Sequence, residues 1–353
     1  MKIIVTHCSP DMDAITSVWL LRKFLPGWEE SGVRFVPAGE KLGRLSVLSS
    51  QLSDVGQSVD RLTGKPRTDK LGSENGQQKT DNRNPIEILG EDEVIHVDTG
   101  LGPLDHHQTA DDKVCAASLT WDFVRRRTTD SRGQRSEDGR QKTQKEKDRE
   151  EAIDRMVKVV VDTDHFKEVF WPSPTADYYE FSIGAVLDGL KLAKPNQDEY
   201  YVSFVSECLD AILHEFENRI WAEKEIRERG IEFTTRFGKS MGFETINDSV
   251  LKLAQKMGYV IVVRKDPRKG YVRIKAMPSQ GEVSKGTKVS KVPKGEKTVD
   301  LTLAYEKLRK MDPNATWFLH IGKKMLLNGS VKNPKMRPTT LSLEKIIDVL
   351  KEI

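Results

Sequence analysis

Residues 2–14 read KIIVTHCSPDMDA, and this stretch decides the fold class. Its first five residues form a short apolar run that predicts a buried β-strand, and polar residues follow at once from His7. Residues 13–24 then predict a helix, because their apolar side chains recur at helical spacing on one face. A strand that leads directly into a helix is typical of the opening of an α/β fold.

The sequence continues to alternate up to about residue 230. Strands are expected at 33–37 and 93–99, helices are expected at 114–124 and 200–229, and an apolar pattern runs through 152–161. Because the expected strands are almost continuously apolar, we expect an α/β fold with a parallel sheet.

The character of the sequence changes after about residue 230. Short strands are expected at 259–264, 271–276 and 316–320, a hairpin turn at 266–270, and helices at 301–311 and 343–350. This pattern predicts a second, smaller α/β domain. We therefore expect a first domain over 1–195, a helical linker over 196–230 and the smaller domain over 231–353, with a cleft between the two domains.

Length and composition exclude several classes of protein. The chain has 353 residues, which is long for one domain, and its three cysteines are too few for a disulfide scaffold or a four-cysteine zinc site. The formal net charge of +3 does not by itself favour a nucleic-acid or membrane partner. No apolar run is long enough to span a membrane and no secretory signal is present, so we expect a cytoplasmic protein with no membrane partner.

Three polar stretches interrupt the pattern, at about 49–90, 125–151 and 278–300. The second contains no hydrophobic residue, so a solvated loop or an exposed helical extension is expected there. All three are interpreted as insertions, and a nucleic-acid contact is the alternative. That alternative would use the arginines at 125–127 and the lysines at 285–297.

Histidines and aspartates gather in four short segments, three of which follow an expected strand or apolar run. In an open parallel sheet, ligands bind beyond the carboxyl ends of the strands, so these side chains are expected to converge. The segments contain His7, Asp11 and Asp13; then Asp98; then Asp105, His106 and His107; and finally Asp162, Asp164 and His165.

Each residue also has a simpler explanation when it is taken alone. Asp11 or Asp13 could cap the helix that follows, Asp98 could be a turn residue, and the histidines could be surface hydrogen bonders. The conjunction of four segments favours a metal centre, because carboxylate and imidazole ligands suit Mn²⁺, Mg²⁺ or Co²⁺. About seven candidate ligands are enough for two cations that share a bridging carboxylate, activate a hydroxide between them and clamp a phosphoryl oxygen.

The same four segments resemble the DHH phosphoesterase superfamily. The resemblance rests on His7-x3-Asp11-x-Asp13-Ala, on Asp98 at a strand end, on Asp105-His106-His107 and on Asp162, within residues 7–166. Two further pieces, Val97-Asp-Thr-Gly100 and Cys115-Ala-Ala-Ser-Leu119, are most similar to the branch of the Myg-type exonucleases. The resemblance implies a DHH-type metal-binding catalytic domain.

The resemblance also implies which residues hold the metals. One metal would be held by His7 and Asp11, the other by Asp13, His106 and Asp162, with Asp98 as the bridge. The expected cofactors are two divalent cations; Mn²⁺ is preferred, with Mg²⁺ or Co²⁺ as alternatives.

Four neighbouring residues receive secondary roles or stay open. His107 is expected beside the scissile phosphate, where it could protonate the leaving group, and Asp105 is expected to fix the position of the histidines. Asp164 stands where the family often has glycine, so it is an alternative ligand. Asp162 is preferred because it ends the apolar run.

The C-terminal domain resembles the substrate domain of this family only loosely. It lacks the family's Gly-Gly-Gly-His loop and instead offers His320, Asn328, Gly329, Ser330 and Arg337 as candidate substrate contacts. The Arg-Lys-Lys signature of family II pyrophosphatases is not evident, which counts against that activity.

The predicted function is that of a metal-dependent phosphoesterase acting on a phosphodiester or phosphoanhydride bond. The expected substrate is a short oligonucleotide or another phosphorylated, nucleotide-like small molecule, and a homodimer is compatible with this prediction. Two alternatives stay open. One is a catalytically silent protein of the same fold that binds metal or nucleotide, and the other is a nucleic-acid-binding module that uses the basic insertions.

Overall fold

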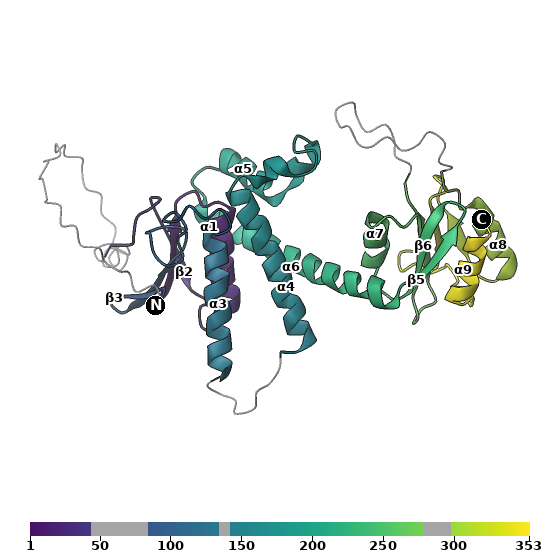
Figure 1. Ribbon diagram of the computed structural model, residues 1–353, viewed down its shortest axis with the longest axis horizontal. Coiled ribbons are helices and arrows are strands. Elements are labelled where there is room, and N and C mark those ends of the chain that lie inside the picture. The colour runs from purple at the N-terminus through teal and green to yellow at the C-terminus, as the bar shows by residue number, and fades with distance from the viewer. Residues whose placement is uncertain (44–83, 134–141, 279–297) are drawn as a thin grey trace, which may run out of the picture. The chain divides into compact units, whose positions relative to one another are not determined.

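The computed structural model describes residues 1–43, 84–133, 142–278 and 298–353. These residues form a mixed α/β protein that divides into two compact units, Met1–Leu213 and His214–Ile353 (Figure 1). The α/β class expected from the sequence is therefore confirmed. Within the described ranges, no helix combines the length and the apolar character needed to cross a membrane.

A four-stranded sheet forms the centre of the first unit. Its strands are β1 (Lys2–His7), β2 (Gly32–Val36), β3 (Ile86–Leu89) and β4 (Asp92–His96). They are arranged in the order β2-β1-β4-β3; β1 runs parallel to both neighbours, and β3 is an antiparallel edge strand. The sheet is mixed, which corrects the expectation of a parallel sheet. The edge strand was missed because its four residues lie within the stretch interpreted as a polar insertion.

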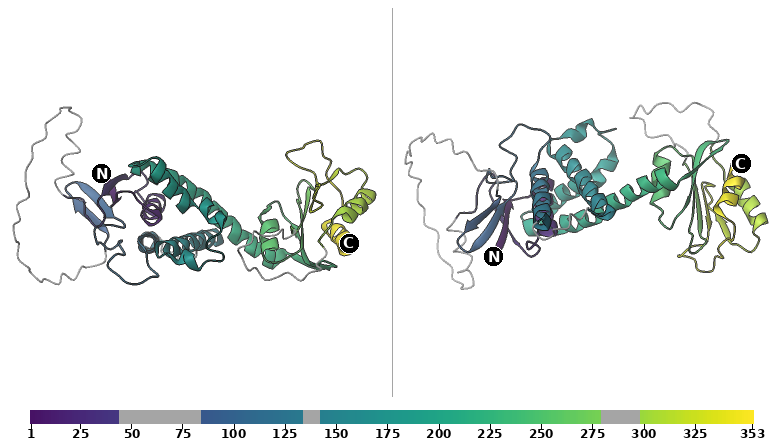
Figure 2. Two further views of the ribbon diagram at one scale, coloured as in Figure 1. Left: turned by 90° about the horizontal axis from the view of Figure 1, so that it is seen from above. Right: turned by 60° about the horizontal axis from the view of Figure 1, so that its bottom comes forward.

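The helices of the first unit pack largely against one another, and α1 also packs against the sheet. They are α1 (Met12–Phe24), α3 (Ala116–Gly133), α4 (Gln144–Asp164), α5 (Ile183–Ala193) and α6 (Asp198–Arg229), with two 3₁₀ segments, Lys167–Phe170 and Asp177–Phe181, before α5. Helix α1 contacts β1, α3 and α4, and α1, α3 and α4 lie side by side (Figures 1 and 2). Helix α1 begins where the sequence predicts, because the Asp11 carboxylate accepts hydrogen bonds from the backbone N–H groups of Asp13 and Ala14.

The polar stretch 125–151 is helical where the structure describes it. Helix α3 continues to Gly133, and α4 starts behind a capping box in which Thr143 and Glu146 satisfy each other's backbone N–H groups. Of the two expectations for this stretch, the helical extension is therefore the one observed. Most of the remaining insertions fall in 44–83, 134–141 and 279–297, which lie outside the described residues.

The second unit is built on a six-stranded sheet. Its strands are β5 (Ile231–Thr235), β6 (Gly238–Glu244), β7 (Ile261–Lys265), β8 (Val272–Ala276), β9 (Trp317–Leu319) and β10 (Met325–Asn328). They follow the order β5-β6-β7-β8-β10-β9, in which only the β6–β7 pair is parallel. The predicted hairpin is the turn between β7 and β8.

Two apolar cores lie on opposite faces of this sheet. The helices are α7 (Ser249–Lys256), α8 (Thr302–Met311) and α9 (Leu343–Lys351). Val262 of β7 packs with residues of α6 and α7, whereas its neighbours Ile261 and Val263 pack with residues of α8 and α9. This alternation follows from the period of two along a strand.

Helix α6 covers the segment expected as a linker, but both of its halves contribute to a core. Tyr201 and Val205 are buried in the first unit. Ala222 and Ile226 belong to the core around α7 in the second. The boundary between the units falls inside this helix, between Leu213 and His214.

Candidate metal centre

The register of the first sheet places His7 beside Asp98. Strands β1 and β4 are parallel neighbours, with Val5 paired to His96, so the residues two positions further on are also adjacent. His7 Nε2 lies 3.2 Å from Asp98 Oδ2. The convergence expected at the carboxyl ends of parallel strands is thus present for these two residues.

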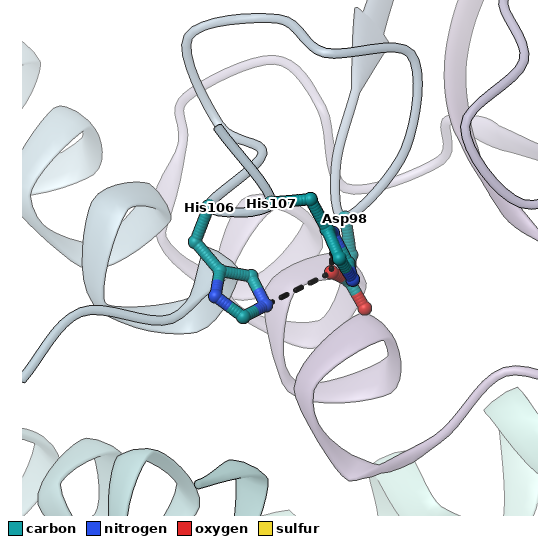
Figure 3. Close-up of side chains that lie close together, drawn as sticks. All are labelled: Asp98, His106 and His107. Atoms are coloured by element: carbon teal, nitrogen blue, oxygen red, sulfur yellow. Dashed lines mark ion pairs between the residues drawn. The ribbon is translucent and has the colours of Figure 1, made fainter. Parts of the chain in front are cut away.

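Asp98 is the central residue of the cluster. While Oδ2 faces His7, Oδ1 lies 3.7 Å from His106 Nε2 and 3.7 Å from His107 Nδ1 (Figure 3). Its backbone adopts a left-handed conformation with φ of 53°, and its N–H donates to the carbonyl oxygen of Leu104. A non-glycine residue in this region is held there at a cost of about 1–3 kcal/mol, which the surrounding structure must offset.

Asp11 serves as a helix cap and can still reach the cluster. One carboxylate oxygen, Oδ1, accepts the two N–H bonds at the start of α1. The other, Oδ2, lies 3.9 Å from His7 Nε2. His7, Asp11 and Asp98 therefore form one group whose ligand atoms all lie within 4.8 Å of one another.

Asp13 also combines two roles. It is almost fully buried, and its two oxygens accept hydrogen bonds of 2.7 Å from the backbone N–H groups of Ala116 and Ala117, at the start of α3. A carboxylate is stabilised at this position because the first N–H groups of a helix have no intrahelical partner. Oδ2 lies in addition 3.7 Å from His106 Nε2, and its second lone pair can serve a metal.

Of the two aspartates at the end of α4, Asp164 faces the cluster and Asp162 does not. Asp164 Oδ2 lies 3.5 Å from His106 Nε2, whereas Asp162 forms an ion pair with Lys158 at 3.3 Å, one turn back on α4. Two residues separated by two positions on a helix point to nearly opposite sides, so only one of them can face the cluster. The sequence interpretation preferred Asp162 because it ends an apolar run. That reasoning holds when the run is a strand, but here the run is the buried face of helix α4.

His165 is a candidate ligand to which the sequence interpretation gave no metal-binding role, although it lies in the fourth segment. Its ring meets the ring of His106 edge to face at 5.7 Å, and its Nε2 lies 3.8 Å from Asp164 Oδ2. His106, Asp164 and His165 form a further group with ligand atoms within 4.8 Å of one another. The sequence does contain a signal for a ligand here, because His165 directly follows Asp164 in the fourth segment.

The imidazole of His107 is held by the carboxylate of Asp105. Asp105 Oδ1 lies 2.8 Å from His107 Nδ1, while Asp105 Oδ2 accepts the N–H of Leu101. The carboxylate of Asp105 is buried, but 59% of the His107 side chain is exposed. Burial alone would lower the pKa of His107, and the hydrogen bond to Asp105 and the charge of Asp98 raise it above its usual value.

The cluster contains buried carboxylate oxygens that no hydrogen-bond donor of the described residues reaches. Oδ1 of Asp98 and Oδ2 of Asp164 are buried and accept no hydrogen bond from the described residues. Burial and the charge of Asp98 raise the pKa of Asp13, and burial is also the main reason why the pKa of Asp164 is raised. Carboxylates that resist ionisation in this way are stabilised by a cation, so the donor set fits a divalent metal.

His7 responds to the negative charge of the cluster. Burial by itself lowers the pKa of this imidazole, but the hydrogen bond to Asp98, the Cys8 carbonyl and the nearby Asp11 together raise it to about 9. His96, in contrast, stays outside the cluster, because its buried Nε2 accepts the N–H of Leu42.

The predicted substrate contacts of the second unit lie at two opposite ends of strand β10. His320 follows β9 and lies at the Met325 end of β10, whereas Gly329, Ser330 and the fully buried Asn328 lie at the other end. Asn328 donates to the carbonyls of Thr316 and Arg337 and accepts the N–H of Thr339. Its amide therefore anchors a loop, which corrects its assignment as a substrate contact.

Gly329 also has a structural role. Its φ is 70°, and a methyl group at this position would clash with the ring of Tyr271. Ser330 Oγ accepts the N–H of Lys332 within the same loop. Of the five predicted contacts, Arg337 and His320 have exposed side chains, and they belong to opposite ends of β10.

No protein-family model matches the chain, and no curated protein matches it. The resemblance to the DHH superfamily therefore stays a prediction.

Proposed function

We propose that this chain is a phosphoesterase of the DHH type that uses two divalent metal ions, with Mn²⁺ as the expected metal. The observation that carries the proposal is the position of Asp98, whose two oxygens face two different histidine-containing groups. His7 and Asp11 would hold one ion, while Asp13, His106 and Asp164 would hold the other, and Asp98 would serve both. Bound divalent ions supply Lewis acidity that activates a water and stabilises charge on a phosphoryl oxygen.

The residues around this donor set can position a substrate and move a proton. His107 is exposed and held at Nδ1 by Asp105, and the hydrogen bond to Asp105 and the charge of Asp98 raise its pKa and so favour its protonated form. A positioned imidazolium with a pKa near the working pH is an effective general acid. We assign His107 the role of protonating the leaving oxygen when a phosphorus–oxygen bond breaks.

The proposed substrate is a phosphodiester, such as a short oligonucleotide, and a phosphoanhydride is the second possibility within the same chemistry. The test begins with elemental analysis of protein exchanged into Mn²⁺ and then desalted, followed by hydrolysis assays on bis(p-nitrophenyl) phosphate and short oligonucleotides. About two metals per chain together with turnover would support the proposal. Metal binding without turnover on any phosphodiester would favour the catalytically silent alternative.

One observation weighs against the nucleic-acid module that uses the basic insertions. Arg125 forms ion pairs with Asp122 and Asp154, and Arg127 donates to the side chain of Asn84. These arginines are therefore satisfied within the first unit. The lysines at 285–297 lie outside the described residues.

A further inference from the structure

Two loops of the second unit meet at one end of its sheet. The first is the turn 266–271 between β7 and β8, and the second, 329–338, follows β10. Because Asn328 pairs with Val272 in the register of β8 and β10, both loops leave the sheet at the same end. A methyl group at Gly270 would meet the Thr339 carbonyl oxygen at 3.1 Å, so the loops are in close contact.

These loops carry a concentration of exposed positive charge. The exposed basic side chains are Arg268 and Lys269 on the first loop and Lys332, Lys335 and Arg337 on the second. Within the described part of the chain, no ion pair is found for those on the second loop. Loop 329–338 contains no acidic residue.

The acidic residues next to the loops serve mainly as backbone anchors; one of them, Asp266, also forms an ion pair with Arg268 at 3.9 Å, and the second loop has no such partner among the described residues. Asp266 is buried and accepts the backbone N–H groups of Arg268 and Lys269. Asp312 is likewise buried, and its Oδ2 accepts hydrogen bonds from Thr339 and Thr340. Both carboxylates therefore point into the fold and hold the loop backbones in place.

The second loop has a defined shape. Met336 N donates to the Asn333 carbonyl, which closes one turn, and Asn333 N donates to the Ser330 carbonyl, which closes another. The Arg337 backbone is held from two sides, because its carbonyl accepts from Thr316 N and from the buried Asn328 amide. Charges on a pre-shaped loop lose less conformational entropy when they bind than charges on a mobile one.

We propose that these two loops form a basic surface that binds the phosphate backbone of a single-stranded nucleic acid. The choice of nucleic acid over other polyanions rests on the proposed phosphodiesterase function, whose proposed substrate is a short oligonucleotide. Lysine and arginine side chains that contact phosphates release condensed counterions, so affinity falls as salt concentration rises. The ring of Tyr271, the last residue of the first loop, lies beneath Lys269 and against Gly329 of the second loop, so the two loops are in contact here as well.

The test compares two double variants of equal charge. Lys332→Glu/Lys335→Glu reverses two charges on the second loop, and Lys252→Glu/Lys256→Glu reverses two exposed charges on α7 of the same unit. Binding of a fluorescein-labelled oligouridylate of about twelve nucleotides is measured by anisotropy, in EDTA and over a range of salt. We expect the loop variant to weaken binding on the order of tenfold or more and to reduce the slope of log affinity against log salt by about 1.4. The α7 variant should bind like the parent protein.

Two further measurements separate this inference from the proposed function. Hydrolysis of bis(p-nitrophenyl) phosphate, which has no strand to bind, should be unchanged in the loop variant. If the parent protein hydrolyses that ester but the loop variant binds the oligonucleotide normally, the basic surface is overturned and the phosphoesterase stands. If the loop variant loses binding while no phosphodiester is hydrolysed, the surface stands and the phosphoesterase is overturned. Binding to phosphatidylserine vesicles in preference to the oligonucleotide would also overturn the nucleic-acid assignment.

Discussion

His7 Nε2 and Asp98 Oδ2 lie 3.2 Å apart, although 91 positions of sequence separate the two residues. They meet because two parallel strands end side by side, and no intervening element has to bring them together. In the protein without metal, this contact places a protonated imidazole against a buried carboxylate. A cation at this position would replace the imidazole proton as the partner of Asp98.

Replacement of the shared carboxylate should empty the whole centre. In Asp98→Asn, both groups lose a charged ligand, so the metal content after Mn²⁺ exchange should fall from about two per chain to near zero, with loss of phosphodiester hydrolysis. Elemental analysis is the measurement. Thermal unfolding of the chelated variant is the control: it should stay cooperative, with a lower melting temperature because the contact between His7 and Asp98 loses its charge. Unchanged metal content would contradict the shared-ligand arrangement.

The two aspartates at the end of α4 provide a matched pair. Asp164→Asn should lower metal content and activity, because Asp164 Oδ2 faces His106. Asp162→Asn should leave both near the parent level and change stability by less than about 0.5 kcal/mol, because it removes only an exposed pair with Lys158. The reverse result, with Asp162 essential and Asp164 dispensable, would restore the assignment made from the apolar run.

The pH dependence of stability reports on the metal-free cluster. The pKa of His7 is raised from 6.5 to about 9 in the folded protein, so the folded state binds more protons than the unfolded state between these values. The unfolding free energy of chelated protein should therefore decrease as pH rises from about 6.5 to about 9. The raised pKa values of Asp13 and Asp164 act in the same direction at lower pH.

Thermal denaturation in EDTA across this pH range would measure the effect. In His7→Gln, the decrease between about 6.5 and about 9 should be smaller than in the parent, since the His7 imidazole is gone while the raised pKa of His107 still contributes. Stability of the parent that rises with pH over the same interval would show that His7 is not held in its protonated form.

The effect of replacing His107 on hydrolysis should depend on whether the leaving group must be protonated. His107→Gln is expected to reduce kcat by about 10²–10⁴-fold for an oligonucleotide, whose leaving alkoxide must be protonated. The same variant should hydrolyse bis(p-nitrophenyl) phosphate at nearly the parent rate, because nitrophenolate leaves without a proton. Metal content is the control and should be unchanged. Equal loss on both substrates would indicate a role in metal or phosphate binding.

The sequence predicted the parts of the site that depend on local pattern. The first strand just before His7, a helix cap at Asp11 or Asp13, and Asp98 near the end of a strand all follow from short-range periodicity and from the polar residues that interrupt it. The choice between Asp162 and Asp164 could not be made, because an apolar run before an aspartate is the same whether it forms a strand or a helix face.

The candidate contacts in the second unit show a different limit. The sequence Asn328-Gly329-Ser330 is typical of a ligand-binding loop. In the structure, however, the amide of Asn328 forms hydrogen bonds with three backbone groups of its own unit. Only the three-dimensional partners of a polar side chain show whether it is available to a ligand. The edge strand β3 was likewise hidden, because strand pairing is a long-range property.

The position of the unit boundary inside α6 has a practical consequence for dissecting the protein. A fragment that ends at 195 would leave the first unit without the side chains of Tyr201 and Val205, and one that begins at 231 would remove Ala222 and Ile226 from the second. Either fragment would expose an apolar surface that the intact chain covers, and would tend to aggregate for that reason alone. Activity lost on truncation at these points therefore cannot be assigned to the missing unit, and point variants in the intact chain are the sounder means of separating the two.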